Sequence, residues 1–78
     1  MLIAVIERNL KIENPDFQDR YIGAPCRSFD EARELCAAHL DRHNEMHTLE
    51  YIDGGTHYAE TDCETGEIVK EFFVRVIG

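Results

Sequence analysis

"HTLEYIDGGTHYAETDCETGEIVKEFFVRVI", residues 47–77, is the stretch that decides the fold. It contains three runs rich in β-branched and aromatic residues, and a turn that contains glycine separates each run from the next. Gly54 and Gly55 allow a positive φ after Asp53, and Gly66 allows it in the second turn, as tight hairpins require. We therefore predict a three-strand antiparallel meander with strands at 47–53, 56–62 and 67–77.

The residues at the start of the chain predict one further strand. "LIAVIE", residues 2–7, is a continuous apolar run of the kind found in strands covered on both faces, and we expect it to extend as far as Ile12. Residues 14–28 hold both prolines and a glycine, so we expect a loop there, with only a short strand at 20–22.

One helix follows this loop. In "SFDEARELCAAHL", residues 28–40, Ser28 and Glu31 have the spacing of a capping box, and acidic residues occupy the first turn. We predict a helix from about Asp30 to about Asn44. The elements together predict a single α+β domain over residues 1–78, with one helix packed on a mostly antiparallel four-stranded sheet.

The predicted helix carries a stripe of possible metal ligands. Cys36, His39 and His43 follow one another at steps of three and four, which returns them to one helix face. With His47, or alternatively His57, as the fourth ligand, they would supply the thiolate and imidazole groups of a tetrahedral zinc site. The same helix face must pack against the sheet, however. We therefore favour a buried stripe, in which Cys36 is a small apolar residue and the histidines are satisfied by the protein itself.

The charge of the chain limits its partners. Sixteen Asp and Glu residues against eight Lys and Arg residues give a net charge of −8 at pH 7. Nucleic acid and anionic membrane surfaces repel such a protein, and no apolar run approaches the roughly 20 residues that span a bilayer. We therefore expect a basic protein surface as the partner, with no direct contact to nucleic acid or membrane.

The negative charge is concentrated in residues 43–69, which include seven acids and no Lys or Arg. Strand alternation places Glu60 and Asp62 on one face with Tyr58. Clustered carboxylates can imitate a row of phosphates and compete for Lys and Arg side chains, although a sheet face that is merely solvated is the alternative. The predicted partner-binding residues are Glu50, Asp53, Tyr58, Glu60, Asp62, Glu64 and Glu67, with Tyr51 as a second aromatic anchor.

Motifs for catalysis are absent from the sequence. It has no glycine-rich phosphate loop, no nucleophile elbow and no paired-histidine metalloprotease motif. A Cys36–His39 nucleophile pair is disfavoured, because a reactive thiolate needs an accessible, electropositive setting. The three cysteines lack framework spacing, which favours free thiols in a reducing cytoplasm, and "MLIAVIERNL" is typical of a strand rather than a signal peptide. We expect a cytoplasmic binding protein with no enzymatic activity and no cofactor.

The layout resembles small single-domain proteins of phages and prophages. The features that carry this resemblance are the opening strand "LIAVIE", the lone helix "SFDEARELCAAHL" and the end of the meander, "TGEIVKEFFVRVI". In layout and acidity the chain is similar to some anti-CRISPR proteins, which are compact inhibitors that bind a bacterial CRISPR effector complex, sometimes in the groove meant for DNA. The resemblance implies a phage-encoded inhibitor that docks on such a complex in the host cytoplasm. It implies no role for any single residue.

A homodimeric structural or accessory protein is the remaining alternative. The last predicted strand carries apolar residues on both faces, and one helix covers only one face of a sheet. The two sets are Ile68, Phe72, Val74 and Val76 on one face, and Val69, Phe73 and Ile77 on the other.

Overall fold

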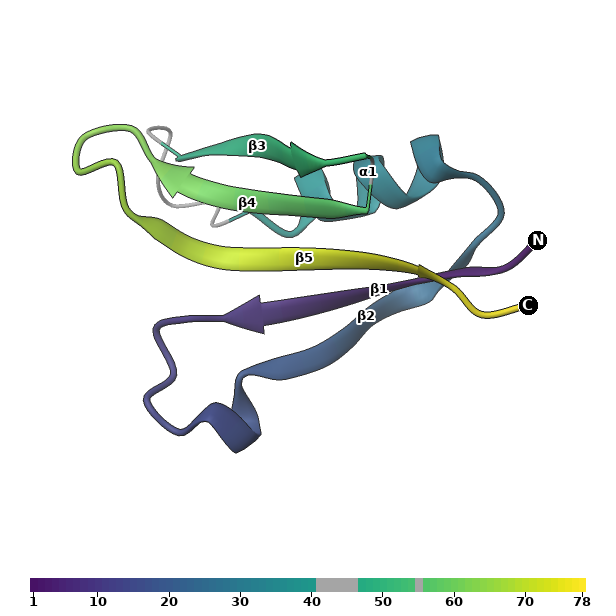
Figure 1. The fold of residues 1–78 in the computed structure, drawn as a ribbon, viewed down its shortest axis with the longest axis horizontal. Helices are drawn as coiled ribbons and strands as arrows, with labels where there is room; N and C mark the ends of the chain where they lie inside the picture. Colours follow the sequence, from purple (N-terminus) through teal and green to yellow (C-terminus); the bar gives the residue numbers. More distant parts are fainter. Residues whose placement is uncertain (41–46, 55) are drawn as a thin grey trace.

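A computed structural model describes residues 1–40, 47–54 and 56–78 of the chain. It contains one α-helix on a five-stranded sheet in which all neighbouring strands are antiparallel, in the order β2-β1-β5-β4-β3 (Figure 1). In chain order the elements are β1 (Ile3–Asn9), the 3₁₀ helix η1 (Pro15–Phe17), β2 (Asp19–Cys26), α1 (Phe29–Ala38), β3 (His47–Asp53), β4 (His57–Asp62) and β5 (Ile68–Val76).

The α+β class and the meander are confirmed, but the prediction of four strands is wrong. The predicted loop over 14–28 contains an eight-residue strand, β2, which pairs with β1 at one edge of the sheet. Both prolines fit this arrangement, because Pro15 opens η1 and Pro25 lies on an edge strand, where a missing N–H is tolerated. Gly23, with φ +64°, lies where the register between β1 and β2 shifts.

The described helix begins close to the predicted residue and ends earlier than predicted. The Ser28 hydroxyl accepts a hydrogen bond from the Glu31 N–H at 3.1 Å, and this confirms Ser28 as the N-cap. The helix ends at Ala38, because the His39 N–H bonds to the Cys36 carbonyl, three residues back, in the tighter 3₁₀ manner. The predicted continuation over 41–44 lies outside the described residues.

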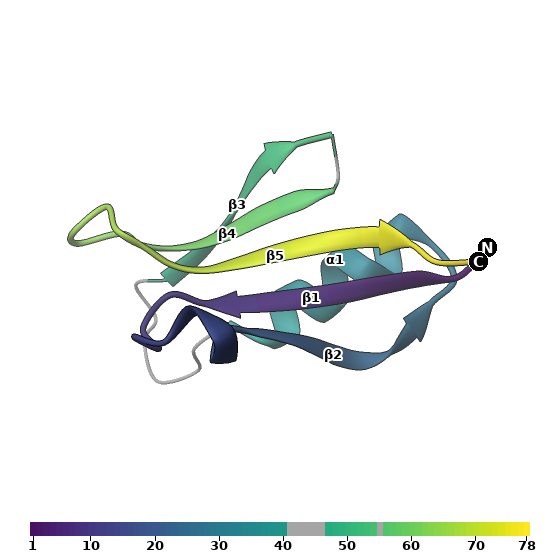
Figure 2. The ribbon, with the colours of Figure 1, turned by 60° about the horizontal axis from the view of Figure 1, so that its bottom comes forward.

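The helix covers one face of the sheet and leaves the other open (Figure 2). On the covered face, strand side chains from Val5, Ile22 and Phe72 meet Ala32 and Cys36 of α1, and all five are buried. In the described part of the chain, no helix is long and apolar enough to cross a membrane.

Candidate functional site: a buried ionic cluster beside an acidic surface

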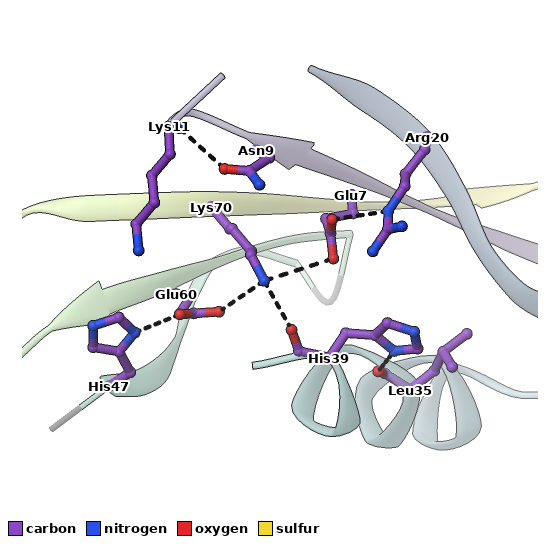
Figure 3. Close-up of polar contacts among 9 residues, drawn as sticks. All are labelled: Glu7, Asn9, Lys11, Arg20, Leu35, His39, His47, Glu60 and Lys70. Atoms are coloured by element: carbon purple, nitrogen blue, oxygen red, sulfur yellow. Dashed lines mark hydrogen bonds and ion pairs between the residues drawn. The ribbon is translucent and has the colours of Figure 1, made fainter. Parts of the chain in front are cut away.

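Charged side chains continue the covered face of the sheet beyond the last turn of α1 (Figure 3). Four strands each contribute one of these side chains. Glu7 of β1 lies opposite Arg20 of β2, and Glu60 of β4 lies opposite Lys70 of β5. Glu7 is only 2% exposed and Glu60 is fully buried. Burial of two carboxylates is costly unless they are paired, so this ionic cluster is the most unusual chemistry in the molecule.

Lys70 lies at the centre of the ionic cluster. Its Nζ is 3.9 Å from Glu7 Oε2 and 3.8 Å from Glu60 Oε1. The same ammonium group donates a hydrogen bond to the His39 carbonyl at 3.2 Å, just after the end of the helix. One partly buried cation, 15% exposed, therefore joins β1, β4 and β5 to the C-terminal end of α1, where helix carbonyls favour positive charge.

Each carboxylate also has a second partner at the margin of the cluster. The Glu7 Oε1 atom accepts a hydrogen bond from Arg20 Nε at 3.0 Å. Glu60 Oε2 lies 2.5 Å from His47 Nδ1, and the other ring nitrogen of His47 lies 3.7 Å from Asp62 Oδ2. The contact between His47 and Glu60 ties the start of β3 to β4. With these partners the ionic cluster connects all five strands of the described sheet to the end of α1.

The position of two predicted partner-binding residues differs from the prediction. The alternation was right, since the strand register places Tyr58 on the same face as Glu60, but that face is the one that α1 and the ionic cluster cover. Tyr58 is 4% exposed and Glu60 is fully buried, so neither side chain is available to a partner. Tyr58 instead supports Tyr51, whose ring meets it edge-on at 5.6 Å and remains 63% exposed.

The other predicted acids do lie at the surface, but not in one row. Glu64 and Glu67 lie in the turn between β4 and β5, whereas Asp53 is at the opposite end of β4, beside the turn from β3. Glu50 lies opposite Ala59 and therefore projects from the open face of the sheet. All four are exposed, and Asp62 is half-buried against His47.

These exposed acids have few opposite charges near them. Within residues 1–40, 47–54 and 56–78, no Lys or Arg forms an ion pair with Glu50, Asp53, Glu64 or Glu67. Lys70, the cation nearest in sequence to Glu64 and Glu67, is directed into the buried cluster. We refer to Glu50, Asp53, Asp62, Glu64 and Glu67 as the acidic surface.

The residues of the proposed zinc site do not come together in the described part of the chain. Cys36 is fully buried, and burial raises the pKa of its thiol to about 12, which also removes it as a nucleophile. His39 Nδ1 bonds to the Leu35 carbonyl at 3.0 Å, while His47 is engaged with Glu60. His43 lies outside the described residues, and among those described no three His, Cys, Asp or Glu side chains converge as a metal site.

The alternative fourth ligand, His57, lies on the opposite side of the sheet. Its ring stacks on Phe73 at a centroid distance of 4.6 Å, and its Nε2 is 2.7 Å from Glu71 Oε2. The sheet therefore lies between His57 and the two helix residues Cys36 and His39, so His57 does not complete a metal site with them.

The sequence reading did not identify Glu7 and Lys70, the two residues that organise the ionic cluster. A signal for both was present. Glu7 follows Ile3 and Val5 at every second position of an apolar run, so it faces the core, and Lys70 interrupts the longest strand. Comparisons with protein-family models, with curated proteins and with solved structures found no match to this chain.

Proposed function

We propose that this chain is a non-enzymatic protein-binding module whose acidic surface docks on the basic, nucleic-acid-binding surface of another protein. The observation that carries the proposal is the set of exposed carboxylates that lack a Lys or Arg partner among the described residues. Such groups repel one another, and a surface rich in Lys and Arg relieves that repulsion while it gains attraction.

The ionic cluster supports this function indirectly. Glu60 and Lys70 hold β4 and β5 against the end of α1, and the turn that carries Glu64 and Glu67 connects these two strands. A rigid base lowers the conformational entropy that the turn loses on binding. The exposed ring of Tyr51, held by Tyr58, supplies a flat aromatic contact of the kind enriched at binding hot spots.

The resemblance in layout and acidity to anti-CRISPR proteins makes a CRISPR effector complex the first partner to test. The experiment measures binding of the purified chain to a purified DNA-binding effector complex at several salt concentrations. We expect binding that weakens as salt rises and that duplex DNA competes away.

Two double variants, each of which removes two negative charges, test the role of the acidic surface. E64Q/E67Q removes two charges from the turn between β4 and β5, and E13Q/D16N removes two exposed charges near η1, in the other half of the sheet. Each exposed pair contributes about 0.2–1 kcal/mol, so we expect E64Q/E67Q to weaken binding by roughly 2- to 30-fold and the control to have a smaller effect. If both double variants lost the same amount of binding affinity, net charge alone would explain the loss, and this would contradict a docking surface at Glu64 and Glu67.

A further inference from the structure

The open face of the sheet, opposite α1, has an apolar centre. Phe73 lies on β5, the middle strand of five, and its neighbours on this face are Ile6 of β1 and His57 of β4. The next residue along this row is Tyr21 of β2, opposite Ile6 and 69% exposed. A hollow of about 220 Å³ beside this row is bordered by Ala4, Tyr21 and Ile77.

Charged groups flank this apolar row with opposite sign on its two sides. On β5, Glu71 and Arg75 lie two residues before and two residues after Phe73, so all three project from the open face. Glu71 is paired with His57, whereas Arg75 is exposed and forms no ion pair with the described residues.

On β1 the two flanking residues differ in size instead of in the sign of their charge. Ala4 and Arg8 lie two residues on either side of Ile6, so a small side chain and a long one are equally distant from the apolar row. The Arg8 guanidinium lies 4.8 Å from the centroid of the Phe73 ring and pairs with Asp19 at 2.8 Å. If a second copy of each strand ran over the first in the opposite direction, the charges on β5 and the side-chain sizes on β1 would therefore be complementary.

We propose that a second copy of this chain covers the open face, and that the two copies pack face to face about a two-fold axis. The axis lies between the two sheets, perpendicular to the strands, and passes over Phe73. It places Phe73 over Phe73, Arg75 of each copy over Glu71 of the other, and Ala4 over Arg8. A two-fold interface requires this reciprocity of contacts, and antiparallel sheets commonly stack in this way about 10 Å apart.

The size and charge of the face suit a second copy. The two longer dimensions of the molecule, 37 and 26 Å, limit the face to about 960 Å², and a standard interface takes about 800 Å² from each partner. Elsewhere the acidic charge makes two copies repel. On the open face Arg8 offsets Asp19 and Arg75 is available to offset Glu71, so the charges around Phe73 are balanced. Glu50 projects from the same face on the edge strand β3, away from this centre.

The proposal goes beyond the binding function, and its test uses the chain alone. Sedimentation velocity from about 1 µM to 1 mM measures the dissociation constant of the dimer. R75E places two acids opposite each other at both symmetric contacts, and we expect it to weaken the dimer at least about tenfold. The control R33E makes the same change of charge at an exposed position of α1, on the other side of the sheet, and should leave the constant within about twofold.

Three outcomes would overturn the proposal: a monomer across the whole concentration range, a dimer that R75E does not weaken, or equal losses in R75E and R33E. Far-UV circular dichroism establishes that each variant folds. If R75E does not fold, Y21D decides in its place, because Tyr21 is 69% exposed and its side chain contributes little to the core. We expect Y21D to weaken the dimer, and an unchanged dimer would overturn the proposal equally.

Discussion

Replacement of Lys70 by methionine tests whether the ionic cluster holds the fold together. K70M keeps most of the side-chain volume but removes the ammonium group that lies 3.9 Å from Glu7 and 3.8 Å from Glu60. Loss of one partner from a buried ion pair costs about 3–5 kcal/mol. The lower end applies here, since Glu7 retains Arg20 and Glu60 retains His47. We therefore expect K70M to lower the free energy of unfolding by about 3 kcal/mol.

That loss is large for a chain of this size. A domain of 78 residues has a total stability of about 4–12 kcal/mol. Urea denaturation followed by circular dichroism measures the effect, and with a slope of about 1 kcal/mol/M the midpoint should fall by about 3 M. The matched control is R33M on the exposed side of α1, for which we expect a change of no more than about 0.5 kcal/mol.

The double variant K70M/E7Q adds a second criterion. Glutamine at position 7 carries no charge, so it does not need the ammonium group, and we expect K70M/E7Q to be more stable than K70M alone. A midpoint shift of less than about 0.5 M in K70M, or a further loss in the double variant, would refute the assignment of Lys70 as the shared partner of two buried carboxylates.

Three further predictions concern local structure. S28A removes the hydroxyl that caps α1 and should cost about 1 kcal/mol in urea denaturation. G23A should cost more than G66A: both glycines have positive φ, +64° and +74°, but a Cβ at Gly23 would lie 2.9 Å from Leu35 Cδ1, whereas Gly66 faces open space. Burial raises the pKa of Cys36 to about 12, above its ordinary value of 9.0, so above about pH 9 the unfolded state loses a thiol proton that the folded state keeps. The free energy of unfolding should therefore fall as the pH rises above about 9, and it should fall less steeply in C36A. Urea midpoints measured at about pH 7–10 test both expectations.

The meander was predictable because its signals are local. Tight hairpin turns need a positive φ, which favours glycine, and Gly54 and Gly66 both adopt one, at +43° and +74°. Ser28 was equally readable as a cap, since its hydroxyl needs only a backbone N–H three residues away. Local patterns therefore located four of the five strands and the start of the helix.

The parts that were missed depend on contacts between distant residues. β2 carries a proline, a glycine and only two buried side chains, Ile22 and Cys26, and it is a strand because β1 offers an edge to pair with. Alternation placed Glu60 on a face with Tyr58, but it could not tell which face the helix would cover. The partners of Glu60 lie 10 and 13 residues away, and no local pattern brings His47 and Lys70 together around it.

The two ends of the described chain lie side by side, at the opposite end of the molecule from the turn that carries Glu64 and Glu67 (Figure 1). The Leu2 N–H donates to the Gly78 carbonyl at 2.7 Å, and the Ile77 N–H donates to the Leu2 carbonyl at 2.8 Å. Chain ends that lie next to each other in this way suit circular permutation and insertion into a loop of a host protein. A fluorescent label or a surface tether attached at either terminus therefore leaves from the same corner and presents the acidic turn outward.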